Sequence, residues 1–517
     1  MMKKLVVVLS AGFLILAIAA PLFAETYIEG QVFYRPRIYW NTDFLNDNKS
    51  TNLATILPIL WLGAGYKAED YAEAYFRLFT LGSRFALGGS SYGATGSIDP
   101  YHHVSLSQAW FDVKIPGTPV HWRVGRFSQA LGHGFYYNTW PYGSDGMKLW
   151  APIGPARVDL GYTKMNELGD FSRDIDQYFG QVSTPISGKH QASLAFQWFE
   201  GRNLNILTNR SSRPGTADHI FTVWDDRVTF DSHIWTIGVS ADGAVPTGAF
   251  TLSYRAEAVY AGGKLTDDFK WAPNSYDKLA RPQDLSGYAF LLGTTANFGG
   301  ITTVSLEGAY GSGDQRKQVH GVDDFKNFSG SRFEGFRIPL AQWGRSAWLD
   351  ESSYIPSIRT GDPFDFGGIS GNGGNNDGKR TAAWVQRGLE NLIYITFGAT
   401  VTPVVPLTLG VDVFKLWAAE TTPKNGFDPD SRIIWKKEQD RDLGWEIDLT
   451  AKWTLNKNFS VAGAFVPWFP GDFFKVPKGS VRVSEPGHPG TSVFSEVEKT
   501  SNPSWGYVAR ANCVFTF

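Results

Sequence analysis

Period-two alternation of apolar and polar residues is the feature that most constrains the fold of this chain. Between Leu443 and Leu455 every odd position carries an apolar residue, whereas the even positions carry glycine, acids, threonines and a lysine. Because successive side chains of a strand point to opposite sides, this segment has one face against an apolar medium and one against a polar medium. The same alternation recurs near 72–78, 191–198 and 252–260. A soluble sandwich also contains such strands, so the connections between them must decide the fold.

The connections between the predicted strands fall into two alternating classes. The eighteen predicted strands are 26–40, 55–66, 71–80, 104–114, 120–127, 145–150, 156–164, 177–184, 190–199, 232–241, 249–260, 286–297, 301–311, 390–402, 407–418, 442–454, 459–469 and 504–517. The short connections include 67–70, 115–119, 185–189, 298–300, 403–406 and 455–458. The long, polar ones are 41–54, 81–103, 128–144, 200–231, 261–285, 312–389, 419–441 and 470–503. Short turns that alternate with long external loops are typical of outer-membrane barrels.

The expected fold is therefore all-β: a single transmembrane antiparallel barrel of about 18 strands, for which a count of 16 is the alternative. A closed barrel pairs every backbone group in lipid, which an open sheet does not. The expected location is the cell outer membrane of a Gram-negative bacterium, with outer-membrane lipid as a partner.

The first residues have the pattern of a secretory signal peptide. Lys3 and Lys4 precede an apolar run over 5–20, and a small-residue cleavage site ends at Ala24. A membrane-spanning helix needs roughly 20 apolar residues, so the run is short for one, although an uncleaved anchor is the alternative. We expect a cleaved signal peptide at 1–24 and the barrel at 25–517.

Composition excludes several functional classes. Charged residues make up 19% of the chain, below the roughly 25% of ordinary globular proteins. The net charge of −2 argues against nucleic-acid binding, which needs a basic surface. Cys513 is the only cysteine in the sequence, so it has no partner for an intramolecular disulfide. No cofactor is expected.

The C-terminal strand carries a second signal. Tyr507, Phe515 and the terminal Phe517 share one face of the predicted last strand. A terminal phenylalanine preceded by spaced aromatic residues resembles the signal by which outer-membrane barrels are recognised. The barrel-assembly machinery is therefore an expected partner, through Phe517.

Projection of the strands places a mixed set of charges in the lumen. The expected solute path consists of Arg35, Arg77, Arg123, Arg126, Asp145, Lys148, Arg157, Asp159, Arg255, Glu446 and Asp448. Rings of fixed charge in a pore confer ion preference, and guanidinium groups bind carboxylates or phosphates through two parallel hydrogen bonds. The alternative is that these ions pair with one another and brace the wall.

Two groups of motifs resemble the alginate-export family of outer-membrane barrels. The first is Val124-Gly125-Arg126-Phe127, followed by Leu131-Gly132-His133-Gly134 and by Ser144-Asp145-Gly146-Met147-Lys148-Leu149. The second is Gly444-Trp445-Glu446-Ile447-Asp448-Leu449 with Phe469-Pro470-Gly471-Asp472. Phe127 stands where the family usually has glutamine. The resemblance implies an eighteen-stranded conduit for a polar, often anionic molecule.

Motifs for metal binding and catalysis are weak. His102, His103 and His133 lie in or near loops without a third ligand at metal spacing. The segment 372–378 is similar to a calcium loop but lacks the closing glutamate. No nucleophile motif is present, so we expect neither a catalytic site nor a metal site, and no enzyme.

The expected function is passive passage of a polar, anionic solute such as a polysaccharide or a small anion, in a porin or an exporter. The alternative is a surface-adhesion or structural barrel with an occluded lumen, because long loops also suit surface recognition. The segment 312–389 carries ten aromatic residues, which predicts that it folds into or over the barrel mouth and narrows it.

Overall fold

The computed structural model describes residues 24–40, 53–81, 85–86, 103–134, 137–139, 143–167, 174–206, 228–270, 283–313, 332–333, 338–339, 385–386, 391–421, 424, 427–428, 433–484, 493–500 and 502–517. The predicted signal peptide up to Phe23 and most of 312–389 lie outside these residues, so neither prediction is tested by the structure.

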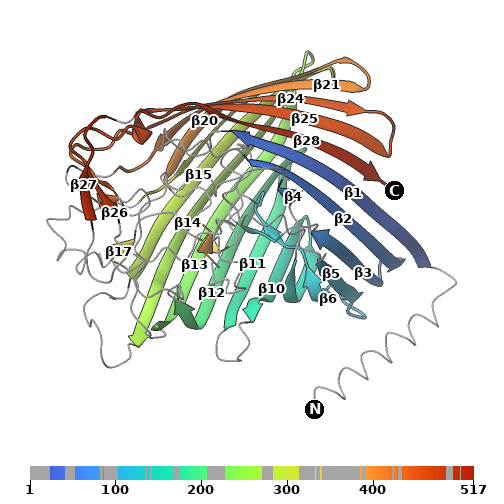
Figure 1. Ribbon diagram of the computed structural model, residues 1–517. Helices are drawn as coiled ribbons and strands as arrows, with labels where there is room; N and C mark the ends of the chain where they lie inside the picture. Colours follow the sequence, from blue (N-terminus) through green and yellow to red (C-terminus); the bar gives the residue numbers. More distant parts are fainter. Residues whose placement is uncertain are drawn as a thin grey trace.

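Eighteen long antiparallel strands form one closed barrel (Figure 1). They are β1 (Ala24–Trp40), β2 (Leu53–Ala68), β3 (Ala72–Leu81), β5 (His103–Lys114), β6 (His121–Phe127), β9 (Ser144–Ile153), β10 (Ala156–Glu167), β11 (Asp174–Ser187), β12 (His190–Ile206), β13 (Val228–Pro246), β14 (Thr251–Lys270), β15 (Gln283–Phe298), β16 (Thr302–Gly311), β20 (Leu392–Val404), β21 (Leu407–Ala418), β24 (Asp442–Thr454), β25 (Phe459–Pro470) and β28 (Gly506–Thr516). The predicted fold class and the count of 18 are confirmed, and each predicted strand overlaps one of these.

The first and last strands close the barrel. In β1 and β28, Phe33 lies opposite Val514 and Arg37 lies opposite Arg510. Beyond the last strand, Phe517 and Gly30 exchange two backbone hydrogen bonds of 3.0 Å. A Cβ atom at Gly30 would lie 2.2 Å from the Phe517 ring, so only glycine admits the ring at this place. The terminal aromatic residue is thus part of the seam.

Tight turns gather at one end of the barrel, together with the start of β1 and the end of β28. These turns occupy 69–71, 115–120, 154–155, 188–189, 247–250, 299–301, 405–406 and 455–458. In the first of them, Asp70 accepts a 2.6 Å hydrogen bond from Lys114 Nζ, which lowers the pKa of the exposed Asp70 carboxyl. Because short turns face the periplasm in such barrels, this end is the periplasmic end.

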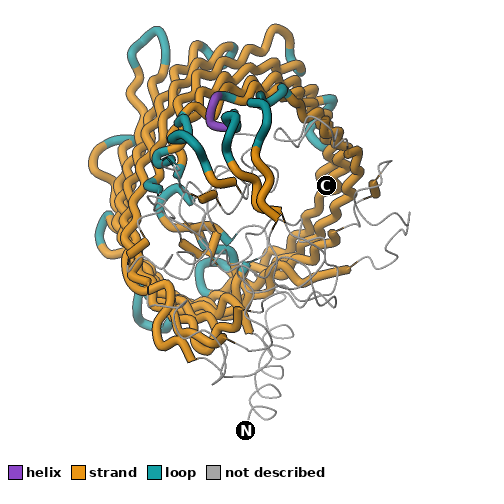
Figure 2. Tube along the Cα trace, turned by 60° about the vertical axis from the view of Figure 1, so that its left-hand side comes forward, coloured by secondary structure: helices purple, strands orange, loops and turns teal. Residues whose placement is uncertain are grey.

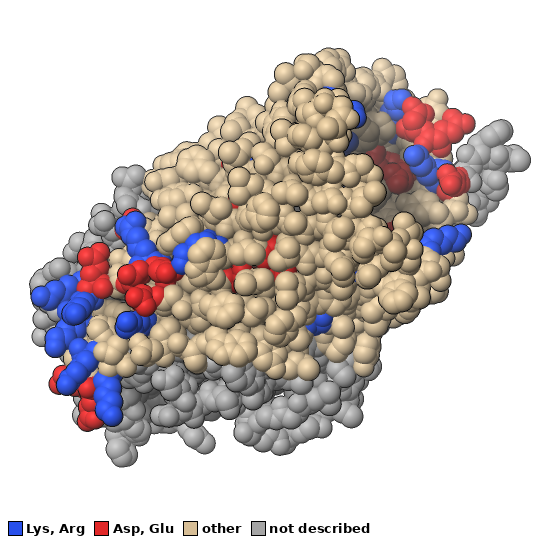
Figure 3. Space-filling model, turned by 90° about the horizontal axis from the view of Figure 1, so that it is seen from above, with Lys and Arg blue, Asp and Glu red and all other residues tan. Residues whose placement is uncertain are grey.

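The outer face of the barrel is apolar. Leu160, Leu292 and Phe397 are more than half exposed although they lie within strands. Figure 3 shows two groups of charged residues at opposite ends of the view, with a broad belt of other residues between them. An apolar belt around a closed barrel is the surface that lipid requires, so the protein is one of the Gram-negative outer membrane. In the described part of the chain, no helix is long and apolar enough to cross a membrane.

A bulge corrects the predicted phase at the start of β24. The alternation placed Leu443 on the lipid face with Trp445, but Leu443 is fully buried whereas Trp445 is 48% exposed. Opposite β21, the register passes from Leu416–Gly444 directly to Trp417–Asp442, so Leu443 has no opposite residue. Gly444 has a φ of +111°, a backbone conformation that favours glycine. The extra residue turns Leu443 inward.

Short elements accompany the barrel. A hairpin of β7 (Ala130–Leu131) and β8 (Tyr137–Asn138) lies between β6 and β9. A small sheet joins β22 (Phe427–Asp428), β23 (Ile433–Ile434), β26 (Val481–Ser484) and β27 (Val493–Glu496), with the 3-10 helix η5 (Asp472–Phe474) before β26. Further two-residue strands are β4 (Phe85–Ala86), β17 (Arg332–Phe333), β18 (Ile338–Pro339) and β19 (Val385–Gln386).

Adjacent positions of β24 test the assignment of its two faces. Leu449 is 46% exposed on the outer face, and Thr450 is the next residue along the strand. We predict that Leu449→Arg destabilises the barrel in lipid vesicles, lowering its free energy of unfolding by about 2–4 kcal/mol if the residue lies at the bilayer midplane. Thr450→Arg should cost much less, because its side chain points into the lumen. Urea titrations of the two variants in vesicles measure both values, and equal costs would contradict the assignment.

Candidate functional site

The described residues of the connection between β6 and β9, which are 128–134, 137–139 and 143, fold into the barrel instead of standing outside it. Figure 2 shows loop segments and short strands inside the ring of long strands. At this segment, Phe127, Leu131 and Tyr137 are completely buried. Tyr137 packs against Phe199 of β12, with ring centroids 6.4 Å apart. Burial of these apolar side chains against the inner wall holds the segment in the lumen, and we call it the inward segment.

Polar contacts from two strands anchor the tip of the inward segment. The backbone N–H of Gly132 donates to Gln181 of β11 over 3.1 Å, and that of His133 donates to Glu257 Oε2 of β14 over 3.1 Å. The Tyr137 hydroxyl donates to Gln177 Oε1 over 2.5 Å. Burial raises the pKa of Tyr137 to about 12, so the hydroxyl keeps its proton at neutral pH. The segment thus extends from β6 to β14 across part of the lumen.

A second apolar group covers another sector of the wall. Trp468 at the end of β25 is fully buried beside Phe474 of η5, with ring centroids 6.4 Å apart in an edge-to-face arrangement. Trp435, Val476 and Val497 form a buried cluster in the segments that carry the small sheet. The helix η5 appears inside the ring in Figure 2. Apolar packing therefore also covers the inner wall at the external end of β25.

The sequence predicts the narrowing at 312–389 and an external loop at 128–144. The second assignment is wrong, because the inward segment is anchored to the inner wall. The signal was available in the sequence, since Leu131 and Tyr137 are apolar residues in a connection that looked polar overall. The role of 312–389 stays a prediction.

Most of the residues predicted for the solute path do face the lumen. Those whose strand positions point inward are Arg77, Arg123, Lys148, Arg157, Asp159, Arg255, Glu446 and Asp448. For Arg35 the structure describes the backbone, which pairs with Leu57. The structure thus brings Arg123, Lys148, Arg157 and Asp159 together on three neighbouring strands, as the sequence predicted.

Arg126 and Asp145 lie on the outer face, which contradicts their predicted place in the lumen. They are opposite each other in β6 and β9, and their side chains are 38% and 57% exposed. Arg126 forms a bidentate ion pair with Asp145 and donates a third hydrogen bond to the Leu106 carbonyl. The error has a simple cause: Arg123 and Arg126 are three residues apart, and a strand alternates with a period of two. This ion pair belongs to the outer wall.

Several of the inward charges brace the wall. Lys148 is 7% exposed and lies 3.5 Å from Asp159 Oδ1 and 3.1 Å from Gln129 Oε1 of the inward segment. Arg77 is buried and donates through Nε to Ser107 over 2.9 Å. Buried charges require such partners because their desolvation is costly. These residues fit the bracing interpretation, not direct contact with a solute.

Three arginines keep hydrogen-bond donors for the lumen. Arg123 uses only Nε, toward Asp112, and Arg157 uses Nε and Nη2, toward Asp159. Arg255 uses Nε and Nη2, toward Glu307. Among the described residues, the remaining guanidinium nitrogens of these three arginines have no hydrogen-bond partner, and Arg157 and Arg255 are nearly half exposed.

These arginines lie near the periplasmic ends of their strands. Arg157, Arg123 and Arg255 are the second, third and fifth residues of β10, β6 and β14, counted from the periplasmic turns. Glu257, which anchors His133, is the next inward position after Arg255. Arg255 therefore lies beside an anchor of the inward segment.

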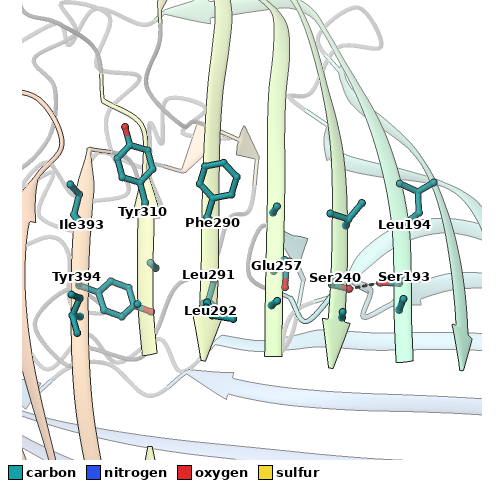
Figure 4. Close-up of a pocket in the computed structure, with 18 of the residues that line it drawn as sticks. Ser193, Leu194, Ser240, Glu257, Phe290, Leu291, Leu292, Tyr310, Ile393 and Tyr394 are labelled. Atoms are coloured by element: carbon teal, nitrogen blue, oxygen red, sulfur yellow. Dashed lines mark hydrogen bonds between the residues drawn. The ribbon is translucent and has the colours of Figure 1, made fainter. Parts of the chain in front are cut away.

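A groove of about 1010 Å³ runs along the wall from β11 to β20. Its lining is mostly apolar and includes the exposed Leu194 of β12 and the exposed Phe290 and Leu292 of β15, which Figure 4 shows at opposite sides of two intervening strands. An apolar groove on a membrane barrel suits lipid chains and not a polar solute. The candidate site is therefore the lumen at the inward segment. Within the described ranges, no group of three His, Cys, Asp or Glu could hold a metal ion.

Comparison with known proteins finds similar structures but no related sequence. No family model and no curated protein sequence matches this chain. Among solved structures, OccK5 (OpdH) of Pseudomonas aeruginosa is 10% identical, with a TM-score of 0.49 over 96% of this chain and 98% of that chain. The outer membrane protein OpdK of the same organism is 8% identical, with a TM-score of 0.48 over 95% and 98%. OccAB4 of Acinetobacter baumannii is 9% identical, with a TM-score of 0.47 over 95% and 98%. None of these likenesses identifies a solute.

Removal of the narrowing should widen the lumen. We predict that replacement of residues 130–138 by a short glycine-serine linker increases single-channel conductance in a planar bilayer, because the tip no longer extends from β6 to β14. Arg126→Gln on the outer face is the control and should leave conductance unchanged. A deletion variant that assembles yet conducts like the native protein would show that the inward segment does not limit the path.

Proposed function

We propose that this barrel is a passive outer-membrane channel for polar solutes, with a preference for anions. One observation carries the proposal: near the periplasmic turns, Arg123, Arg157 and Arg255 direct unused N–H groups into the lumen. A polar solute that loses part of its hydration shell in a narrow passage needs hydrogen-bond donors there. Guanidinium groups stay charged at any working pH and match carboxylate and phosphate oxygens.

The acids at this level are largely engaged, which supports the anion preference. Asp112, Asp159 and Glu307 are nearly fully buried, and each accepts hydrogen bonds from one of these arginines. Asp242 is more exposed, at 44%, and lies 3.8 Å from His133 Nε2. The three acids that pair with these arginines are therefore hidden from the lumen, whereas the arginines keep free donors toward it.

The resemblance to the alginate-export family suggests the finer solute class. The motif that begins at Val124 and the motif that ends at Leu149 form β6 and β9, and the inward segment connects them. The resemblance therefore falls on the part of the chain that narrows the lumen. We propose a sugar acid or a polymer of sugar acids as the solute, since both combine hydroxyl groups with carboxylates.

An occluded barrel is the second candidate, and the apolar packing in the lumen favours it. Phe127, Leu131 and Tyr137 on one side and Trp468 with Phe474 on the other are buried like core residues. Such packing would also suit a structural or adhesive barrel that conducts nothing. Measured passage separates the two functions. In either case, we propose that the barrel-assembly machinery recognises the strand that ends at Phe517.

Passage and charge preference are tested together by swelling of liposomes that contain the protein. We predict that glucuronate enters faster than glucose, which is similar in size but uncharged. The triple variant Arg123→Gln, Arg157→Gln, Arg255→Gln should bring the ratio of the two rates close to one, because it removes the free guanidinium donors.

The matched control is Arg126→Gln, which removes an arginine from the outer face and should leave the ratio unchanged. If neither solute enters liposomes that contain the folded barrel, the occluded barrel is supported. A ratio that stays high in the triple variant would assign the three arginines to bracing alone.

A further inference from the structure

Five lumen-facing side chains near the periplasmic turns stack on one another. We call Trp110, His121, Arg123, Trp150 and Arg157 the stacked array. The guanidinium carbon of Arg123 lies 3.8 Å from the centre of the Trp110 ring, and that of Arg157 lies 4.3 Å from the Trp150 ring. The His121 ring stacks on Trp150 at 3.8 Å with an angle of 16° between the planes. Cation–π contacts and ring stacking thus link neighbouring strands.

Stacking determines how the array meets a solute. His121 and Arg157 both stack on Trp150, and Arg123 stacks on Trp110. A solute ring therefore has little aromatic face on which to stack. Only the edges of the guanidinium planes remain accessible to a solute, so a solute should be bound by the N–H groups at these edges. The array is consequently suited to oxygen atoms of a solute and not to its rings.

One buried carboxylate orders three members of the array. Asp112 is 4% exposed, and its Oδ2 atom accepts hydrogen bonds from Arg123 Nε over 2.9 Å and from Trp150 Nε1 over 2.8 Å. Its Oδ1 atom lies 2.9 Å from His121 Nδ1. Asp112 thereby links β5 to side chains of β6 and β9. A carboxylate with three such partners holds the planes of all three side chains in place.

The bond to Asp112 leaves one complete edge of Arg123 for a ligand. Asp112 engages Nε, and in the described residues neither Nη1 nor Nη2 of Arg123 has an acceptor. These two nitrogens present parallel N–H bonds at a spacing that matches the two oxygens of a carboxylate or phosphate. Arg157 adds Nη1, because Asp159 engages its Nε and Nη2. The free donors belong to side chains that stacking has already immobilised.

We infer that the stacked array is an oxyanion-binding subsite in the solute path and that Asp112 is the positioning residue that sets its geometry. The inference rests on the proposed function, because a subsite in the lumen matters only if solutes enter. Its ligand is a solute that carries a carboxylate or a phosphate, with or without an aromatic ring. Binding there would retain the solute briefly beside the narrowing.

Loss of the Asp112 charge should have an unusual effect. Removal of a negative charge from an anion path ordinarily strengthens anion binding. Asp112→Asn should instead weaken it, because a neutral amide oxygen accepts more weakly from Arg123 Nε and Trp150 Nε1 than a carboxylate oxygen does, so these two side chains are held less firmly. Loss of one charge-assisted hydrogen bond corresponds to about a tenfold weaker affinity. Asp242→Asn is the matched control, and it should strengthen oxyanion binding.

Single-channel recording with an added solute tests the subsite. Glucuronate and glucose 6-phosphate are the probes, and glucose is the neutral reference. In the native protein, we expect brief blocking events with one or both anions and fewer with glucose. Events with glucuronate alone assign the ligand as a carboxylate, events with the phosphate alone assign it as a phosphate, and events with both support the shared chemistry. Equal events with all three solutes overturn the subsite.

The variants then separate position from charge. Asp112→Asn should shorten the block by either anion about tenfold, whereas Asp242→Asn should lengthen it. A longer block in both variants means that Asp112 acts only as a charge and overturns its positioning role. Arg123→Lys keeps the charge but lacks the two parallel donors, so an unchanged block in this variant overturns the subsite even if Asp112→Asn does not assemble. A native protein that never conducts contradicts the proposed function itself, whereas conduction without oxyanion block contradicts only this inference.

Discussion

Backbone hydrogen bonding in lipid is the constraint on which the rest of this structure depends. Lipid offers no partner to an exposed N–H or C=O group, so the eighteen strands must close, and β28 must pair with β1. Closure forces each strand to have one lipid face and one lumen face. The period-two pattern, the apolar belt and the inward charges all follow from that division. The pair of hydrogen bonds between Gly30 and Phe517 extends this closure to the last residue.

The need of buried polar groups for hydrogen-bond partners also determines how charges are arranged inside the barrel. A carboxylate buried in the wall needs donors, and Asp112, Asp159 and Glu307 obtain them from arginines on the same strand, the next strand or the next but one. A guanidinium group has five N–H bonds, and a single carboxylate accepts from only some of them. The remaining donors of these arginines face the lumen. In the proposed function, bracing and solute binding are therefore two uses of the same side chains. The sequence offers them as alternatives, and the proposal joins them at Arg123.

The strands were predictable because lipid and water impose a period of two that local sequence displays directly. The prediction of side-chain direction failed where a bulge interrupts the period of two and where the assignment of a residue did not follow that period. The bulge at Gly444 moved Leu443 inward, and Arg126 was assigned to the wrong face of a strand that keeps strict alternation. The inward segment was missed because its anchors Gln177, Gln181 and Glu257 are distant in sequence. The stacking of Trp110 and Trp150 with arginines depends on the register between strands, which composition does not reveal.

The central claim is that a polar path past the inward segment is open and presents guanidinium donors to the solute. The most direct measurement is the current through the native protein in a planar bilayer that separates two concentrations of potassium chloride. The account predicts discrete conductance steps and a reversal potential of the sign that selective passage of chloride produces. Folded protein without steps, or a reversal potential of the sign that selective passage of potassium produces, would contradict it.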